Sequence, residues 1–263
     1  MATITSLVDT TTTTNQGKPG DTVQINGTAM GTTTRVNFGA ATVTPTGVTA
    51  TQVTFVVPST APCSGQVAVS VSSNTGATSN ALPFFVIAAP TTTALNVSCL
   101  PAATGGAATL FGTNFLTGTQ VAVGTVGNVA VTPTQSNQVT FTAPANPGQV
   151  ADVSTQAVTI TTAGGTSASG TTLVDYYLTP AITTVAPATG TAGDDVTITG
   201  TSFVGVDTVT FTDSAAATAT AVFTPISGTQ LVATVPGGLA TGAGTITVHT
   251  CGGTSNAVAF TIT

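Results

Sequence analysis

The stretch DVTITGTSF, residues 195–203, occurs in related form three times in this chain of 263 residues and decides the fold. The other copies are DTVQINGTAM at residues 21–30 and AATLFGTNF at residues 107–115. Their shared glycines, Gly27, Gly112 and Gly200, lie 85 and 88 residues apart, and each precedes Thr, a variable residue and a large apolar residue. Self-similarity at a fixed period is typical of repeat architectures. The chain is therefore predicted to contain three related units.

Two further sequence blocks follow each copy in the same order. The second block ends in proline and reads TQVTFVVP to Pro58, NQVTFTAP to Pro144 and TQLVATVP to Pro236. The third block closes each unit and reads NTGATSNALPFFV from Asn74, AGGTSASGTTLV from Ala163 and CGGTSNAVAFTI from Cys251. We place the units at about 1–88, 89–180 and 181–263 and refer to them as units one, two and three.

Each unit reads as β-strands from end to end. Apolar residues alternate with Thr and other polar residues, which is the period of a strand with one buried face. The expected inward residues of unit one are Val23, Ile25, Val36, Phe38, Val53, Phe55, Val57, Val67, Val69 and Val71. Those of unit three are Val196, Ile198, Val209, Phe211, Leu231, Ala233, Val235, Ile246 and Val248. Turn signals separate the runs, so about seven short strands per unit predict an all-β fold of small sandwiches.

The order of these blocks resembles the IPT/TIG family of immunoglobulin-like domains. Unit three carries the resemblance with ITTVAPATGTAGDDVTITGTSF from Ile182, VTF at residues 209–211 and GGTSNAVAFTI from Gly252. Unit one matches nearly as well, whereas unit two departs from the pattern at residues 107–108 and 169–170. The resemblance implies three tandem immunoglobulin-like β-sandwich domains. It leaves function open, because one fold serves many functions and similar domains occur in receptors, adhesins, polysaccharide enzymes, transcription factors and phage structural proteins.

Charge is scarce along the whole chain. Lys18 and Arg35 are the only basic residues, all eight acidic residues are Asp, and charged residues make up 4% of the chain, against ~25% in ordinary proteins. A nucleic-acid binder neutralises phosphates with Lys and Arg, and a polybasic membrane-surface protein needs the same residues. One His and three Cys leave little material for proton transfer or nucleophilic catalysis. We therefore predict a protein that is not an enzyme, uses no cofactor and binds no nucleic acid.

The chain is expected to fold and to stay out of the membrane. Its mean hydropathy of +0.46 and net charge of −6 are unlike those of disordered chains. The longest nearly apolar stretch, residues 81–90, is too short for a helix of about 20 residues that crosses a bilayer. The first ten residues lack the basic and apolar regions of a signal peptide. Such a protein would leave the cell by another route, or the sequence begins after its signal.

Each unit contains one cysteine, Cys63, Cys99 or Cys251, so no disulfide is expected within a unit. The immunoglobulin-like order implied by the resemblance places Cys99 at the end where the chain leaves unit two. It places Cys251 at the end where the chain enters unit three. These ends face one another in a tandem array, so we predict a Cys99–Cys251 bridge with a Cα–Cα separation below ~7 Å. The alternative is three buried or idle thiols, and Cys63, expected in a turn, is unpaired in either case.

Other polar residues have both a functional and a structural interpretation. His249 lies on a predicted strand of unit three without the nucleophile and acid of a catalytic constellation, so we interpret it as an ordinary strand residue. Asp194 and Asp195, with Asp207 and Asp213 as helpers, are the candidates for Ca²⁺ binding, which needs six to eight oxygens. Aspartates that bond to their own turn are the preferred interpretation. No metal site and no catalytic site is predicted.

Three signals relate to sugars. Tyr176 and Tyr177 are the only tyrosines, and on the last strand of unit two one ring is expected to point inward and the other outward, for stacking on a glycan. Asn26 and Asn96 fit the pattern for N-glycosylation, which arises by chance in a chain rich in Thr and Ser. The Thr run at residues 10–14 is either O-glycosylated or, in our preferred interpretation, a flexible N-terminal strand extension.

The missing charges indicate an assembly. Sandwiches normally protect exposed strand edges with charged residues, especially Lys, and a nearly uncharged surface removes the repulsion between molecules. Edges without Lys are therefore either short and bulged or covered by neighbouring chains. Three units placed end to end would form a semi-rigid rod of about 100 Å.

We therefore predict a non-enzymatic structural protein of an extracellular assembly. The first interpretation is a virion component, such as a decoration or fibre protein of a phage capsid or tail. The alternatives are a bacterial or archaeal surface filament subunit or adhesin, or a carbohydrate-binding module. The expected partners are other protein subunits of the assembly and host-surface glycans, and the expected location is extracellular or the virion surface.

Overall fold

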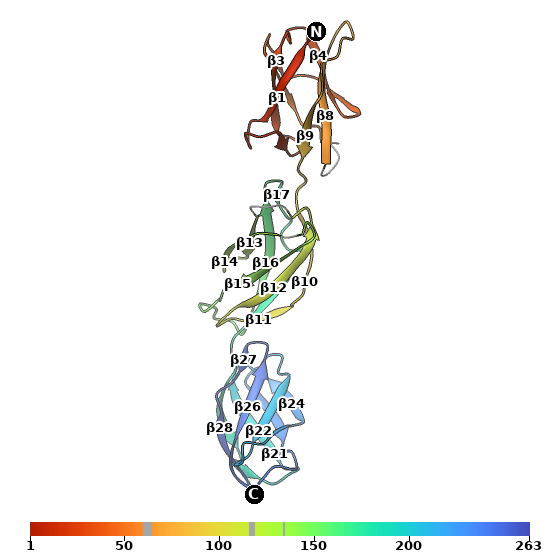
Figure 1. The fold of residues 1–263 in the computed structure, drawn as a ribbon. Helices are drawn as coiled ribbons and strands as arrows, with labels where there is room; N and C mark the ends of the chain where they lie inside the picture. Colours follow the sequence, from red (N-terminus) through yellow and green to blue (C-terminus); the bar gives the residue numbers. More distant parts are fainter. Residues whose placement is uncertain (60–64, 116–118, 134) are drawn as a thin grey trace.

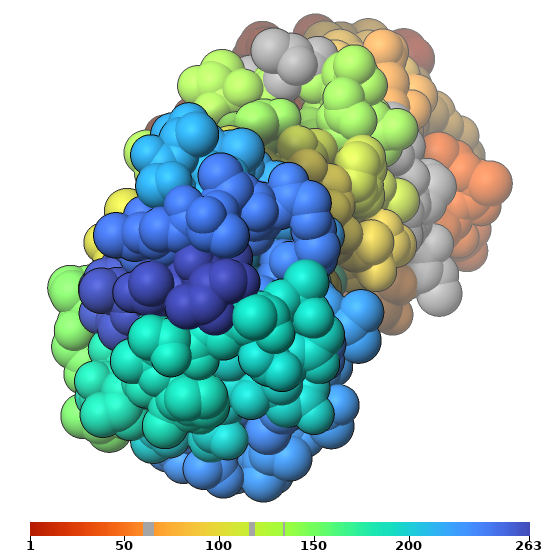
Figure 2. All heavy atoms as spheres, turned by 90° about the horizontal axis from the view of Figure 1, so that it is seen from below, coloured from red at the N-terminus to blue at the C-terminus, as the bar shows by residue number. Residues whose placement is uncertain are grey.

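The structure, a computed structural model, describes every residue of the chain except 60–64, 116–118 and 134. Three β-sandwiches follow one another end to end, with the N-terminus at one tip and the C-terminus at the other (Figure 1). Viewed from below, unit three lies in front and partly hides the other two (Figure 2), so the molecule is elongated. The predicted all-β class is confirmed. In the described part of the chain, no helix is long and apolar enough to span a membrane.

Unit one has two sheets packed face to face. The first has the order β1-β3-β7-β6, with β1 Thr3–Asp9, β3 Thr22–Thr28, β7 Gln52–Val56 and β6 Gly47–Val48. The second has the order β2-β9-β8-β4-β5, with β2 Gln16–Gly17, β9 Leu82–Val86, β8 Gly65–Ser73, β4 Thr33–Phe38 and β5 Ala41–Val43. The first strand changes sheets, because β1 pairs with β3 and β2 pairs in parallel with β9.

Unit two repeats this arrangement with one sheet reduced. The smaller sheet has the order β10-β12-β15, with β10 Thr91–Leu95, β12 Gly106–Thr113 and β15 Gln138–Ala143. The larger has the order β11-β18-β16-β13-β14, and β17 also pairs with β16. Its strands are β11 Cys99–Pro101, β18 Leu173–Tyr177, β16 Val153–Thr162, β13 Thr119–Val123, β14 Gly127–Val131 and β17 Gly165–Thr166. The three-stranded sheet leaves β15 at an edge.

Unit three repeats the arrangement of unit one. Its four-stranded sheet has the order β19-β21-β25-β24, with β19 Ala181–Ala186, β21 Asp195–Thr201, β25 Gln230–Thr234 and β24 Phe223–Ser227. Its six-stranded sheet has the order β20-β28-β26-β22-β23, with β27 beside β26. These strands are β20 Thr189–Gly190, β28 Val258–Ile262, β26 Gly242–Thr250, β22 Thr208–Thr212, β23 Thr218–Thr220 and β27 Gly253–Thr254.

Each unit encloses its own hydrophobic core. Every inward residue that the alternation predicts for units one and three is buried, with at most 6% of its surface exposed. Phe38 contacts Phe55 and Phe84 in the core of unit one, and Phe211 contacts Phe260 in that of unit three. Burial of these apolar surfaces supplies the main driving force for folding.

The shared glycines of the repeat sit where a side chain would not fit. A Cβ at Gly200 would collide with the carbonyl oxygen of Ala181 on the neighbouring strand and with the ring of Phe203. Gly27 and Gly112 have the same kind of neighbours. The glycine therefore allows the large apolar residue three positions later to fold back against the strand.

The Thr run at residues 10–14 corrects one expectation, because it forms a turn and not a flexible strand extension. β1 ends at Asp9, whose buried carboxylate accepts the N–H groups of Thr11 and Thr12 at 2.8 and 2.7 Å. The Thr12 and Thr14 hydroxyls bond to each other at 2.9 Å. The aspartate fixes the turn at the point where the first strand changes sheets.

Candidate functional site at the joint between units two and three

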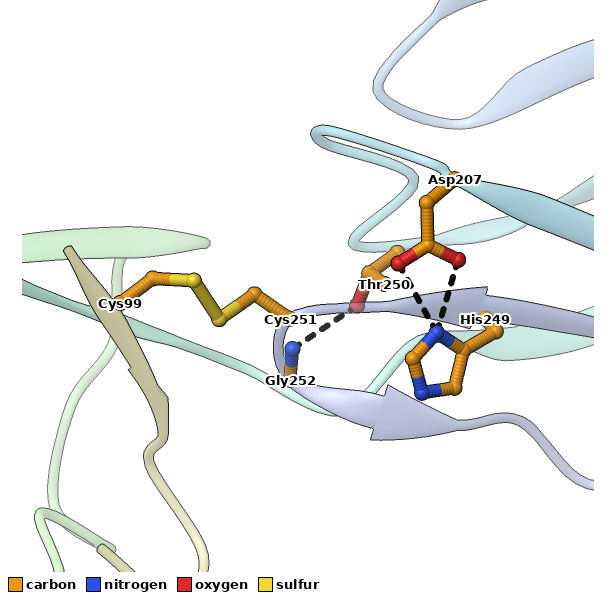
Figure 3. Close-up of a disulfide and its surroundings, with 6 residues drawn as sticks. All are labelled: Cys99, Asp207, His249, Thr250, Cys251 and Gly252. Atoms are coloured by element: carbon orange, nitrogen blue, oxygen red, sulfur yellow. Dashed lines mark hydrogen bonds and ion pairs between the residues drawn. A yellow bond between two sulfur atoms is a disulfide. The ribbon is translucent and has the colours of Figure 1, made fainter. Parts of the chain in front are cut away.

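A disulfide joins unit two to unit three. Cys99 and Cys251 are bonded, their Cα atoms lie 6.2 Å apart, and 152 positions separate them in the sequence (Figure 3). Cys99 begins β11, which pairs with β18 where the chain leaves unit two. Cys251 lies in the turn between β26 and β27, at the end of unit three that the chain enters. The bond therefore fixes the ends that the domain order brings together. The remaining cysteine, Cys63, lies outside the described residues.

Two hydrogen bonds accompany the disulfide. The Ser202 hydroxyl of unit three donates to Oδ1 of Asp152 in unit two at 2.7 Å. The Thr179 hydroxyl, on the linker, donates to the carbonyl oxygen of Gly252 at 2.9 Å. The joint is thus held at three positions, one covalent and two polar.

The turn that receives the linker needs a glycine. A Cβ on Gly252 would collide with the carbonyl oxygen of Leu178, the last residue before the linker. The Thr250 hydroxyl accepts the Gly252 N–H at 3.0 Å and so holds this turn in place (Figure 3). At the first joint, Gly164 has the same relation to the carbonyl oxygen of Ala88. Both joints are therefore built on a glycine that lets the following unit approach the linker backbone.

The variable residue of the first block also contacts the preceding unit or its linker. Ser202 and Asn114 occupy this position in units three and two, with positive φ angles of 58° and 60°. The Asn114 amide donates to the carbonyl oxygen of Ala89 at the first joint, 3.1 Å away. In unit one the position is Ala29. The repeat thus has a constant backbone conformation here, and the side chain decides the polar contact across each joint.

The two tyrosines have different surroundings, and Tyr176 is the ring that points inward, as the predicted alternation requires of one of them. The ring of Tyr176 is fully buried, and its hydroxyl donates to the carbonyl oxygen of Pro144 at 2.8 Å. Burial raises the pKa of this hydroxyl. Tyr176 is therefore a core residue and cannot stack on a glycan. Tyr177 is half-buried, and its ring lies beside Gly205 of unit three, so it belongs to the joint.

His249 has a partner that the sequence pattern does not predict. Its Nδ1 lies 2.7 and 3.0 Å from the two carboxylate oxygens of Asp207 (Figure 3). Both side chains are about half exposed. Among the described residues, no hydrogen bond involves the other ring nitrogen of His249. Cys251, two positions along, is in the disulfide, so this pair has no neighbouring thiol to activate.

The four aspartates considered for Ca²⁺ serve separate local purposes. Asp194 accepts the N–H and the hydroxyl of Thr191, and these two bonds lower its pKa. Asp195 accepts the Thr234 hydroxyl, and Asp213 caps a turn. Within the described ranges, no cluster of three metal-ligating side chains occurs.

The two asparagines of the glycosylation pattern both make hydrogen bonds within the protein. The Asn26 amide donates to the Ser6 hydroxyl at 3.1 Å and accepts a bond from Gln52. Asn96 is exposed, and its Oδ1 accepts the N–H of Thr109 at 2.6 Å.

Comparison with known proteins identifies the type of domain. The model of the IPT/TIG domain family matches residues 2–86 and 180–262. A protein solved with a xylogluco-oligosaccharide is 21% identical over all of this chain and 60% of its own, with a TM-score of 0.44. The extracellular region of plexin A4 is 13% identical over 90% of this chain and 21% of its own, with a TM-score of 0.38.

SGBP-B from a complex xyloglucan utilization locus of Bacteroides uniformis is 20% identical over 66% of this chain and 49% of its own, with a TM-score of 0.29. This chain thus spans less than two thirds of each of these solved proteins. A search of curated protein sequences finds no match.

Proposed function

Since the chain belongs to the IPT/TIG domain family, we propose that it is a non-enzymatic stalk of an extracellular assembly. Its role in this proposal is to set a distance between a surface and whatever the stalk presents. The observation that carries the proposal is the second joint, where a disulfide and two hydrogen bonds hold consecutive sandwiches end to end. A catalytic domain does not need such a lock, whereas a spacer with a defined length does.

The disulfide also supports the extracellular location. Disulfides form and persist outside the cell and in other oxidising compartments, and cytosolic thiols stay reduced. The scarcity of charge supports the same setting, because a surface covered by Thr does not depend on salt or pH for its interactions. Virion capsids or tails are the first setting we propose, and cell-surface filaments or adhesins are the second.

Small-angle X-ray scattering of the purified chain tests the stalk. We expect a maximum dimension of about 100 Å, as three sandwiches in a line require. A compact particle, in which the units fold back on one another, would contradict the proposal.

Antibody labelling tests the setting. Gold-labelled antibodies against the chain are applied to intact virus particles and to intact cells from the same culture. Labelled particles support the virion setting, and labelled cells without labelled particles support the cell surface. Labelling of cells only after they are made permeable would contradict an extracellular role.

A further inference from the structure

A groove runs along the side of unit two, between its first strand, β10, and its last strand, β18. Residues 93–98 line one wall and residues 171–173 line the other. The groove has a volume of about 370 Å³, and ligand sites have roughly 300–1,000 Å³. At one end the hydroxyls of Thr92 and Thr171 bond across it at 3.0 Å, and at the other end β11 pairs with β18. Between these ends, no backbone hydrogen bond joins the two walls in the described part of the chain.

The wall formed by β18 has an open backbone edge at Leu173. The carbonyl oxygen of the preceding residue, Thr172, accepts the N–H of Val158 at 2.8 Å and so points to β16. Because hydrogen bonds alternate along a strand, the N–H and C=O of Leu173 point the other way, toward the groove. Asp175, two residues later, uses this same side when its N–H donates to the carbonyl oxygen of Ser98. β11 begins to pair only at Asp175, so among the described residues no strand pairs with Leu173 on the groove side.

A buried hydroxyl without a partner lies next to this edge. Thr172 is 4% exposed and lines the groove. Its Oγ1 makes no hydrogen bond to any of the described residues. Native proteins leave few buried polar groups without a partner, because the lost contact with water is not replaced. The groove therefore contains an unused donor and acceptor in addition to the edge of Leu173.

In unit one the equivalent edge is closed. Pro83 corresponds to Leu173, because the residue two positions after each donates its N–H to the segment where the first strand changes sheets. Proline has no N–H to offer, and its carbonyl oxygen accepts the side-chain amide of Asn15 at 3.3 Å. The residue before it is Leu82, which has no hydroxyl and packs against the core. Unit one thus offers neither the backbone edge nor the buried hydroxyl that unit two leaves open.

These features select an extended peptide as the occupant. A strand edge with a free N–H and C=O is complementary to the backbone of another strand, which adds to the sheet through main-chain hydrogen bonds. The unpaired stretch from residue 171 to residue 175 spans about 13 Å, the length of about four extended residues. Leu95 and Val97 supply apolar walls for a side chain of the peptide. None of the described residues that line the groove is charged.

We propose that the groove between β10 and β18 binds an uncharged, extended peptide segment of another protein. The peptide pairs with the edge of β18, where its carbonyl oxygen accepts the Leu173 N–H and its own N–H donates to the Leu173 carbonyl oxygen. The Thr172 hydroxyl bonds to a main-chain group beside this pair, and an apolar side chain enters beside Leu95 and Val97. The site does not depend on the length of the stalk, so the inference goes beyond the proposed function.

Selection from a phage-displayed library of random linear heptapeptides on the immobilised full chain tests the proposal. We expect the enriched peptides to be uncharged and rich in β-branched residues, which suit an added strand. Fluorescence anisotropy of an enriched synthetic peptide then measures its affinity. The variant Leu173→Pro removes the N–H and reproduces the residue that unit one carries. We expect it to weaken binding about tenfold.

The variant Thr172→Val separates a role in binding from a role in stability. Valine has nearly the shape of threonine, and Val258 occupies the corresponding position in unit three. Replacing a buried hydroxyl that has no partner removes the cost of burying it. We therefore expect the melting temperature of the free chain to rise and the affinity for the peptide to fall several-fold. A purely structural hydroxyl would not move the two measurements in opposite directions.

The matched control is Ala259→Pro, which places a proline at the position in unit three that corresponds to Leu173. The residue before it is Val258, so this edge has no buried hydroxyl beside it. We expect unchanged affinity for the peptide. Amide hydrogen exchange gives a direct readout in the unchanged chain, because the Leu173 N–H should exchange readily without the peptide and become protected with it.

Several results would overturn the proposal. They are no enrichment of any peptide, equal affinity for the unchanged chain and Leu173→Pro, and a gain in stability of Thr172→Val without a loss of affinity. Self-association that Leu173→Pro abolishes would instead make the groove a contact between copies of the chain. Binding of cellohexaose that this variant abolishes would assign the groove to a sugar. Scattering measures the stalk independently, so the two proposals fail separately.

Discussion

Asp213 ties two loops of unit three together through one carboxylate. Its Oδ2 accepts the N–H of Ala240 at 2.8 Å, and its Oδ1 accepts those of Ala215 and Ala217 at 2.8 and 2.9 Å. The bond from Ala240, together with the other two, holds the pKa of Asp213 below its ordinary value. These bonds connect the turn after β22 to the segment before β26.

A pH dependence follows from this lowered pKa. The contribution of the ionised Asp213 to stability is complete above the ordinary pKa of 3.8 and is lost as the pH falls through the lower pKa of the folded state. We expect Asp213→Asn to lower the melting temperature of unit three by several degrees at pH 7, because an amide NH₂ cannot accept all these N–H groups. The variant should also lose less stability than the unchanged chain below pH 3.8. Differential scanning calorimetry measures both effects.

The matched control for this prediction is Asp195→Asn. Asp195 is exposed and accepts one hydroxyl bond, from Thr234. We expect almost no change in melting temperature at pH 7. Asp194, whose pKa is also lowered, keeps part of the acid sensitivity in both variants. Equal destabilisation by the two substitutions would contradict the role of Asp213.

At the joint between units two and three, some contacts of single residues could be predicted from the sequence and others could not. The immunoglobulin-like domain order that the family resemblance implies places Cys99 and Cys251 at facing ends, and this inference needs no coordinates. The contact between His249 and Asp207 depends on the register of β22 against β26, which pairs Thr208 with His249. The sequence did not indicate the role of Ser202. That role depends on a backbone conformation with positive φ, which Asn114 and Ala29 share at the same position of the repeat.

At the scale of the strand, a proline protects one exposed sheet edge against pairing with another chain, at a place where no charged residue does so. β24 is the edge of its sheet; it contains the exposed Ile226 and directly follows the exposed Val222. The carbonyl of Val222 bonds inward to Thr234, and because such bonds alternate along a strand, the nitrogen of Pro225 faces outward. Proline has no N–H to offer a further strand. The same Thr-Pro pair occurs at Pro45 and Pro133, but there it lies outside the strands, after β5 in unit one and after β14 in unit two.

Removing this protection is expected to cause association. Pro225→Val restores an outward N–H on an uncharged apolar edge, which is a template for pairing with another chain. We expect dimers and larger species whose amount increases with protein concentration. Light scattering coupled to size-exclusion chromatography measures it, with Pro236→Val, outside the strands, as the control. A monomeric Pro225→Val variant at high concentration would show that the edge is protected by other means.

The prolines also show where sequence reasoning about edges was incomplete. Scarcity of Lys leaves short, bulged edges or covering neighbours as the alternatives, and β24 uses an outward proline with a register shift next to it. In unit two, by contrast, the alternation of apolar and polar residues predicts the fold where the family resemblance is weak. The family model does not match it, yet Ala108, Leu110, Val139 and Phe141 are buried in alternation as in its neighbours. The alternation of inward apolar residues is therefore enough to form the sandwich even where the block shared by the other two units is altered.

At the scale of the whole molecule, the two joints differ in strength. The first is held by the Gly164 contact and one Asn114 hydrogen bond, and the second has a disulfide in addition to its hydrogen bonds. We expect Cys99→Ser with Cys251→Ser to leave the folding of each unit intact and to broaden the distribution of distances between units two and three. Scattering of the variant and of the reduced unchanged chain should agree. Curves identical to that of the oxidised chain would mean that the polar contacts alone hold the joint.

The disulfide has one more consequence, which concerns damage to the backbone. It closes a ring of chain that contains most of unit two, the second linker and most of unit three. A protease that cuts once inside this ring leaves the two fragments joined by the disulfide, so the C-terminal part of the chain stays attached to the N-terminal part. A cut in the first linker, near residues 88–91, lies outside the ring and releases unit one. An extracellular stalk of this kind would therefore shed its N-terminal unit first under proteolysis and retain the other two as a covalent pair.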